Sequence, residues 1–426
     1  MINYVPSVSI ACLRNGHLHS GGKLVRFCSG SESVHNVVGR CGKLLMPGSH
    51  TAGGYGAARI LTIIRHVDMA LMRVAVFGLL LLPLPMIASA QESKQYQEQP
   101  DEFSELSLEQ LMEVDVVSIN VLGTHTHLEG EWMFAYQFMF MRMDGSRDGT
   151  NRLSDSDVLA DFPVTPTNMT MKMHMPMVMY APSDDLTLMA MLPYIKLEMD
   201  HVLGPLSPKP GARFTTKSEG FGDLNVGALY TFYRKNFDEH RLIFKAALSV
   251  PTGSIDKKDV LANPAQGKQK LPYPMQLGSG TFDLHPAITY VGEMGDWAWG
   301  GEVEATIRLG ENSNDYTLGD RYKISGWVNW KWTDWLAPFV RIDGEVWENI
   351  DGADPDLNPA VVPTADPGRR AGEQIDLLAG VNLYALGGPL KGQRLAIQGR
   401  LPVYRSLDGP QLETDWQITV GWQWVF

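Results

Sequence analysis

Six methionines alternate with other residues between positions 169 and 179, and this spacing suggests chemistry more directly than any other short segment of the chain. Successive side chains of a β-strand point to opposite faces, so a period of two places all six thioethers on one face. Soft thioethers together with the imidazole of His174 suit Cu(I) or Ag(I), which makes a metal-binding or metal-conducting stripe one interpretation. The other interpretation is that methionine is an apolar filler on a surface that faces lipid.

Neighbouring residues divide the methionines between two faces. Aromatic residues occupy the even positions from 132 to 140, which predicts that this face contacts lipid and that the methionines from 133 to 143 face inward. In the next run Lys172 and His174 are the polar residues, so we expect them on the inner face and the methionine ladder on the outer one. The candidate soft-metal ligands are Met139, Met141, Met143 and His174.

Other combinations of reactive residues are sparse. His125 and His127 would supply half of a metal site, but without further ligands in the sequence we expect a solvated pair ahead of the first strand. The sequence has no nucleophile elbow, phosphate-binding loop or zinc-helix motif, and His240 and His285 have no obvious nucleophile at matching strand depth. We therefore expect a protein that is not an enzyme and that uses no cofactor.

Charged side chains recur on one face of the later period-two runs. In residues 296–309, for example, Glu302 and Glu304 lie on the face opposite Val303 and Ala305. Such a face indicates a wet interior, either as a narrow aqueous pathway or as acids and bases that pair across neighbouring strands. The candidate pore-lining residues are Asp283, His285, Glu302, Glu304, Arg308, Arg341, Asp343, Glu345, Asp376, Arg394 and Arg400.

The elements that position these groups are twelve runs in which apolar and polar residues alternate. They span about 129–143, 169–181, 185–199, 220–234, 240–251, 280–292, 296–309, 320–333, 335–347, 373–386, 392–404 and 414–426. A soluble sandwich would also alternate, but tryptophan and tyrosine near the ends of the runs favour a bilayer interface. The runs predict an all-β fold, namely a transmembrane antiparallel up-and-down β-barrel of about twelve strands and of bacterial outer-membrane type.

The connections between the runs alternate between short and long. Short periplasmic turns and long outer loops are typical of bacterial barrels, and an even number of strands returns both ends of the barrel to the periplasm. The chain ends on Phe426, which resembles the C-terminal aromatic residue that the barrel assembly machinery recognises in this class. We therefore expect outer-membrane lipids and that machinery as partners.

The region before the barrel has the composition of an export signal. Residues 69–90 contain Arg73, an apolar run and a small-residue cleavage site after Ala90, which predicts a signal peptide that directs the chain to the outer membrane. Residues 1–68 then form a mis-annotated or non-native extension, residues 91–128 a periplasmic segment and residues 129–426 the barrel. Residues 91–426 contain 28 Lys and Arg against 46 Asp and Glu, a formal net charge of −18, which argues against nucleic acid as a partner.

Four segments resemble one family of outer-membrane proteins, the transporter-like barrels named for the meta-pathway of phenol degradation. They are "MYAPSDDLTLMAMLPYI", "GFGDLNVGALYTFY", "LIFKAALSVPTGS" and "GSGTFDLHPAITY", which follow one another between Met179 and Tyr290. The resemblance implies a barrel that moves small, often hydrophobic compounds. The methionine-rich early strands depart from the family pattern, so the cargo is not carried over.

These observations lead to an outer-membrane channel or transporter for a small solute, hydrophobic or aromatic compounds included. The alternative is an outer-membrane barrel that does not conduct and is structural or binds soft metals such as copper or silver.

Overall fold

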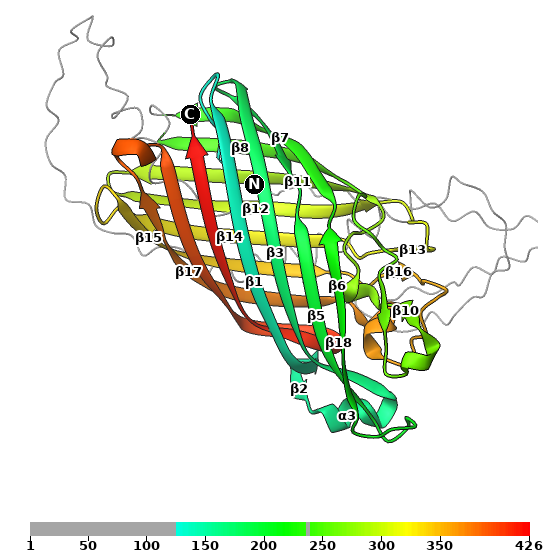
Figure 1. Cartoon of the computed structure of the whole chain (residues 1–426). Helices are drawn as coiled ribbons and strands as arrows, with labels where there is room; N and C mark the ends of the chain where they lie inside the picture. Colours follow the sequence, from blue (N-terminus) through cyan, green and yellow to red (C-terminus); the bar gives the residue numbers. More distant parts are fainter. Residues whose placement is uncertain (1–124, 236–238) are drawn as a thin grey trace, which may run out of the picture. The chain divides into compact units, whose positions relative to one another are not determined.

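The computed structural model describes residues 125–235 and 239–426, which form an antiparallel barrel (Figure 1). The expected extension, the expected signal peptide and nearly all of the expected periplasmic segment lie outside the described residues. Within the described residues no helix is long and apolar enough to cross a membrane.

Thirteen labelled strands build the wall and its extension toward one end. They are β1 (Trp132–Gly149), β3 (Val164–Ser183), β4 (Leu186–Met191), β5 (Tyr194–Leu203), β6 (Arg213–Phe221), β7 (Leu224–Lys235), β8 (His240–Val250), β11 (Phe282–Met294), β12 (Trp297–Leu309), β14 (Arg321–Trp330), β15 (Leu336–Trp347), β17 (Gly372–Tyr384) and β18 (Gln393–Val425). Each pairs with its neighbours in antiparallel register, and pairing of β1 with β3 closes the ring.

The ring contains twelve passes of the chain. Strand β18 crosses the wall twice, because residues 394–407 pair with β17 and residues 407–425 pair with β1. Strands β4 and β5 form one pass with a break at residues 192–193, and β6 and β7 form another with a break at residues 222–223. The structure therefore confirms the predicted fold class and strand number.

The outer face of β11 and its neighbours is apolar, as the period-two pattern predicts, whereas the outer face of β5 and β6 carries the charged pairs Lys196–Glu219 and Lys217–Glu198. On β11, Leu284 and Ile288 are 40% and 52% exposed, whereas Asp283 and Ala287, which directly precede them, are 1% and 3% exposed. A wall whose large apolar side chains are exposed and whose acids are buried is stable only when lipid covers the outer face.

An aromatic belt surrounds the end of the barrel that carries the short turns. The rings of Trp297, Trp330 and Trp332 stack in sequence, with centroids 5.6 and 5.8 Å apart. Phe426 lies at the same end, where its ring stacks on Phe134 at 5.7 Å and packs on Trp424 at 4.6 Å. Rings with a polar edge favour the level of the lipid headgroups, so this belt marks one membrane interface.

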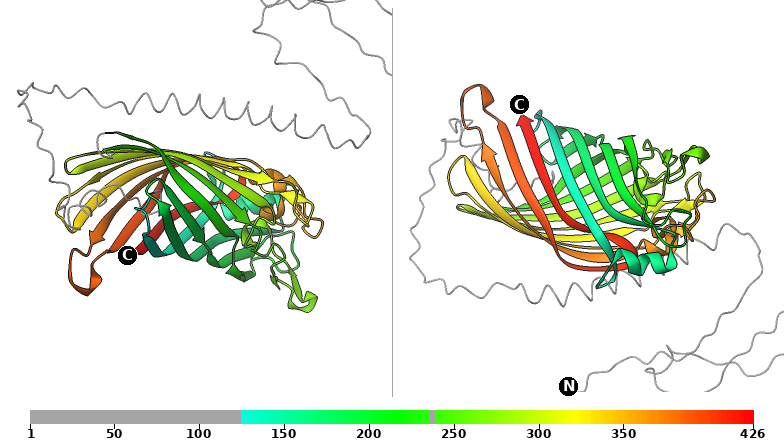
Figure 2. Two further views of the ribbon diagram at one scale, coloured as in Figure 1. Left: turned by 90° about the horizontal axis from the view of Figure 1, so that it is seen from above. Right: turned by 60° about the horizontal axis from the view of Figure 1, so that its bottom comes forward.

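The long connections gather at the opposite end, as Figures 1 and 2 show. They carry β2 (Asn151–Leu153), α3 (Asp155–Asp161), β9 (Lys258–Val260), β10 (Lys268–Lys270), η4 (Tyr273–Met275), β13 (Tyr316–Thr317), β16 (Asp351–Gly352), η5 (Pro363–Ala365) and η6 (Pro367–Arg369). Side chains link these loops to one another: Lys270 contacts Asp354 at 2.6 Å, and the Asp354 amide donates to the Tyr273 hydroxyl at 3.0 Å. The loops therefore form one connected layer.

The loop of residues 251–281 also folds against the inner face of the wall. Leu271, Met275 and Leu277 are buried in a cluster with Met169 and Met199, which lie on β3 and β5. The Ser218 hydroxyl of β6 donates to the Met275 carbonyl at 2.7 Å and fixes the turn η4. The loop thus narrows the barrel at this end.

Candidate functional site: the barrel interior

One side of the interior is an ionic network built by β8, β11, β12, β14, β15, β17 and β18. Asp343 of β15 accepts from the guanidinium groups of Arg341 and, at 2.6 Å, Arg400. Arg400 also lies 3.5 Å from Asp376, so one arginine bridges two strands. Register places Asp343 of β15 opposite Asp376 of β17, and it places Arg341 and Arg400 in the adjacent row on either side of Leu378, so each arginine reaches its carboxylates diagonally.

A second part of the network occupies β8, β11 and β12. Arg308 pairs with Asp283, and Lys245 pairs with Glu304 at 2.6 Å. Asp283, Arg341, Asp343 and Asp376 are buried, and Lys245, Glu304, Arg308 and Arg400 are half-buried, so partners of opposite sign within reach stabilise their charges.

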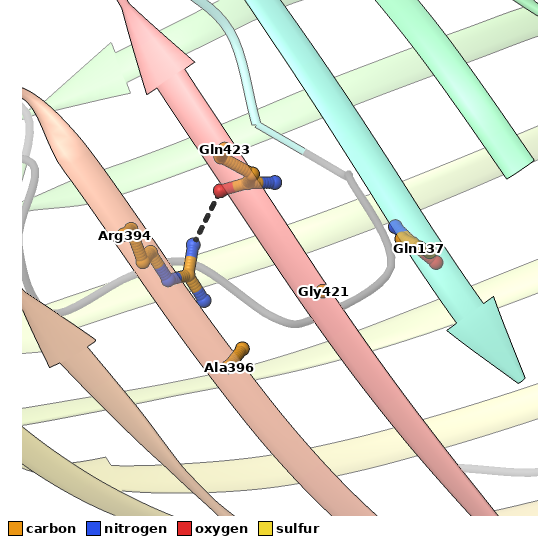
Figure 3. A pocket seen from close by; sticks show the side chains of 5 residues that line it. All are labelled: Gln137, Arg394, Ala396, Gly421 and Gln423. Atoms are coloured by element: carbon orange, nitrogen blue, oxygen red, sulfur yellow. Dashed lines mark hydrogen bonds between the residues drawn. The ribbon is translucent and has the colours of Figure 1, made fainter.

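The structure places every candidate pore-lining residue on the inward face, where most have a partner. Glu302 accepts from the Thr289 hydroxyl at 2.8 Å, the His285 Nδ1 lies 3.1 Å from the Thr306 hydroxyl, and Glu345 pairs with Arg321 at 3.1 Å. Figure 3 shows Arg394 beside Gln423 on the neighbouring pass, to which it donates at 3.1 Å. Gln137 of β1 lines the same small pocket. Pairing of acids and bases across neighbouring strands, one of the two expectations for these charged residues, is therefore present. A role of these residues in conducting a solute stays a prediction.

The other side of the interior is lined by methionine, contrary to the prediction that the methionine ladder faces lipid. On β3, Met169, Met177 and Met179 are 1%, 6% and 1% exposed, whereas Lys172 is exposed. Register places methionines of adjacent strands opposite one another, as in the row Met143, Met169 and Met199. The physical reason is that inward methionines find apolar partners inside the barrel: the loop of residues 251–281 packs on Met169, and inward side chains of β1, β7 and β8 pack on Met177 and Met179.

His174 faces outward and not inward, so the candidate metal set is not brought together. Its Nδ1 lies 2.6 Å from the hydroxyl of Tyr136, a residue of the aromatic outer face of β1. Met139, Met141 and Met143 lie on the opposite, inward face, opposite Met173, Met171 and Met169 of β3. Among the residues that the structure describes, no group of three or more His, Cys, Asp or Glu side chains is arranged to hold a metal ion.

The expectation that His125 and His127 are solvated is also wrong. Both are buried, with ring centroids 4.7 Å apart, and the His127 amide donates to the Thr187 hydroxyl of β4 at 3.0 Å. The neighbouring Thr126 bonds to Thr231 of β7 at 3.1 Å. Burial first, and then nearby positive groups, hold the pKa of His125 well below its ordinary value, so this imidazole is neutral at pH 7.

A cavity of about 380 Å³ lies where the two sides of the interior meet the loop layer. Its wall includes inner-face methionines of β1, β3 and β5, inner-face arginines of β12 and β18, and residues of the loops. Of the predicted residues, Met141, Met143, Arg308, Glu345 and Arg400 contribute to it. The lining residues Tyr273, Arg321 and Arg370 were not predicted. Alternation along a strand assigns no direction to a loop residue such as Tyr273 or Arg370, and Arg321 stands at the first position of β14.

Comparison with known proteins supports the family resemblance. The family described as "Putative MetA-pathway of phenol degradation" matches residues 165–358, which include all four segments that carry the resemblance. No curated protein matches the chain. The predictions that the chain has no catalytic activity and no cofactor stay predictions.

Solved structures with a similar fold are outer-membrane proteins. The COG4313 outer membrane channel from Pseudomonas putida F1 has 15% identity and a TM-score of 0.49, covering 71% of this chain and 98% of the other. The β domain of the Bordetella autotransporter BrkA has 13% identity and a TM-score of 0.37, covering 70% and 100%. A Pseudomonas aeruginosa FadL homologue has 11% identity and a TM-score of 0.32, covering 69% and 89%. At this level of sequence identity and TM-score, the similarities carry no information on the solute of this chain.

Proposed function

We propose that this outer-membrane barrel is a channel for a small solute, hydrophobic or aromatic compounds included. The observation that carries the proposal is the contrast between the two faces of one closed wall. The outer face bears Ile288, Val303 and Val340, which are 52%, 59% and 54% exposed, and the inner face bears the ionic network. Lipid covers the first face, which leaves the second as the boundary of a water-accessible interior.

The interior also has the two surfaces that a solute with an apolar part needs. Methionine side chains adapt their shape to different apolar groups, whereas the fixed arginines and carboxylates on the other side orient polar groups. The loop of residues 251–281 narrows the passage at one end, which favours small solutes over large ones.

Conductance of the purified protein in a planar bilayer tests this proposal. We expect discrete openings, and a shift toward cation selectivity in Arg400→Gln, because this change removes a positive charge from the inner face. Arg142→Gln is the matched control, since Arg142 is 40% exposed and lies on the outer face of β1. A barrel that never opens, or equal shifts in both variants, would contradict the proposal.

A second candidate function is the binding of Cu(I) or Ag(I), which the inward orientation of the methionines favours. Met141 pairs with Met171, and Met143 with Met169, across two strands. Titration with Cu(I) of wild type, Met139→Leu/Met141→Leu and the control Met294→Leu, whose side chain is 69% exposed, decides this point. Loss of binding in the double variant alone supports the metal function, whereas equal weak binding in all three proteins excludes it.

We also propose lipids and the barrel assembly machinery as partners. The Phe426 ring is 54% exposed beside the aromatic belt, and its backbone pairs with Trp132 at 2.9 and 3.0 Å. The terminal residue is therefore both the end of the closing strand and an accessible apolar group.

A further inference from the structure

We propose that the cavity under the loop layer binds a small organic monoanion that has a compact apolar or aromatic body, with Arg370 as the group that holds its carboxylate. The proposal rests on the proposed channel function, since the cavity lies at one end of the interior. Its volume of about 380 Å³ is in the usual range for small-molecule sites.

The apolar part of the site is a wall of five methionines. Met143, Met169 and Met199 form one row across β1, β3 and β5, and Met141 and Met171 form the next. Thioethers make favourable contacts with the edges of aromatic rings, and their flexible side chains close around bodies of different shape. This wall therefore favours an apolar body, and aromatic bodies in particular.

The opposite part of the site is cationic. Arg308, Arg321, Arg370 and Arg400 contribute to the lining, against the two carboxylates Glu345 and Glu348. Three of the four arginines have carboxylate partners, namely Arg308 with Asp283, Arg321 with Glu345, and Arg400 with Asp343 and Asp376. Among the described residues the fourth, Arg370, forms no ion pair, and Asp366, the carboxylate that acts on it electrostatically, pairs with Arg369 instead.

Arg370 is held in place without being neutralised. Its amide donates to Asn349 at 2.6 Å, its carbonyl accepts from the Trp347 indole at 2.7 Å, and its Nη2 donates to Gln411 at 2.8 Å. The Nη1 atom is buried and has no hydrogen-bond partner among the described residues. Burial lowers the pKa of Arg370 to about 10, so the group remains charged at neutral pH. A fixed, half-buried guanidinium that has no ion pair of its own and whose nearest electrostatic partner, Asp366, is shared with Arg369 favours the binding of an anion.

The two walls together select the class of ligand. A small cation would be repelled by Arg370, the lining arginine that has no ion pair, and a neutral compound would leave the Arg370 Nη1 without a partner. An inorganic anion would satisfy the arginine but leave the methionine wall without an apolar contact. A monocarboxylate with an apolar body satisfies both walls, because a guanidinium binds a carboxylate through two parallel hydrogen bonds.

Equilibrium binding to the detergent-solubilised full chain tests the proposal, with benzoate, benzyl alcohol and inorganic phosphate as probes. We expect benzoate to bind at least about tenfold more tightly than either of the others, because only benzoate engages both walls. Arg370→Gln should weaken benzoate binding by about tenfold or more, and Arg370→Lys by less, since lysine keeps the charge but not the two-point geometry. The control Arg142→Gln should leave binding unchanged.

No binding of benzoate to the wild type would overturn the proposal, as would equal binding to Arg370→Gln. Phosphate binding as tight as that of benzoate would also overturn it, since the methionine wall would then contribute nothing. If Arg370→Gln fails to fold, the weaker binding expected of Arg370→Lys keeps the test decisive. The binding measurement needs no conduction, so a barrel that is silent in bilayers but binds benzoate would refute the channel and leave this site standing.

Discussion

Replacement of Asp343 by asparagine tests the ionic network most sharply. The Asp343 side chain is 1% exposed and accepts from Arg341 and, at 2.6 Å, from Arg400, while the Lys323 ammonium lies 4.0 Å away. Asparagine keeps the size of the side chain but leaves three positive groups without their shared carboxylate. Breaking a buried ion pair on one side costs roughly 3–5 kcal/mol, and the wet interior reduces this value, so we expect a loss of about 3 kcal/mol in the free energy of unfolding.

Urea unfolding of the refolded barrel in phospholipid vesicles, followed by tryptophan fluorescence, measures this loss. Asp334→Asn is the matched control, because the Asp334 side chain is 75% exposed and pairs with Lys331 at 3.3 Å on a short turn. An exposed pair of this kind contributes about 0–1 kcal/mol. Suppose that both variants lose less than about 1 kcal/mol in the free energy of unfolding, and that the slope of this free energy against urea concentration is unchanged. This result would show that Asp343 is solvated and that the network does not stabilise the wall.

Three further predictions concern the loop layer and the C-terminus. Met275→Ala should increase the conductance and the protease sensitivity of residues 251–281, because Met275 is completely buried between this loop and the methionine wall. The hydrogen bond from Lys270 holds the pKa of Asp256 below its ordinary value. The stabilisation that this bond gives the loop of residues 251–281 is therefore present at neutral pH and is lost as the pH falls below about 4. The protease resistance of this loop should drop below that pH in the wild type, and the pH dependence should be absent in Lys270→Met. Deletion of Phe426 should lower the yield of membrane-inserted barrel in cells while refolding in detergent is retained, and equal loss in both would contradict a role in recognition.

The wall of the barrel was predictable because its residues obey one local rule. On β12, Glu302 and Glu304 alternate with Val303 and Ala305, and the alternation alone gives the face of each. The ends of the strands were less predictable. Strand β1 continues beyond the expected residue 143 to residue 149, and β3 begins at residue 164, before the expected residue 169. Asp415 illustrates a limit of the rule, because a register shift between Thr414 and Trp416 leaves this residue without a partner on β1 and exposed.

The direction in which residues of β3 point was less predictable, because contacts with residues distant in the sequence decide it. Lys172 and His174 were expected inside because polar residues usually mark the wet face. His174 is outside because Tyr136 supplies a hydrogen-bond partner there, and Met169 is inside because Met275 and Leu277 pack on it. Neither contact can be inferred from alternation along one strand.

The cavity was not predictable from sequence at all. Arg370 lies between η6 and β17, where no periodicity assigns a direction, and its position depends on Asn349, Trp347 and Gln411. That Arg370 has no ion pair becomes visible only when the ion pairs of the neighbouring arginines are known.

The central claim is that the wall of β3 turns its methionines inward and its polar residues toward lipid. Residues 91–426 contain no cysteine, so Met171→Cys and His174→Cys each introduce a single labelling site when the protein is produced from residue 91 onward. With a bimane label at each site in vesicles of brominated lipid, we predict strong quenching at position 174 and little at position 171. Strong quenching at position 171 with little at position 174 would contradict the account.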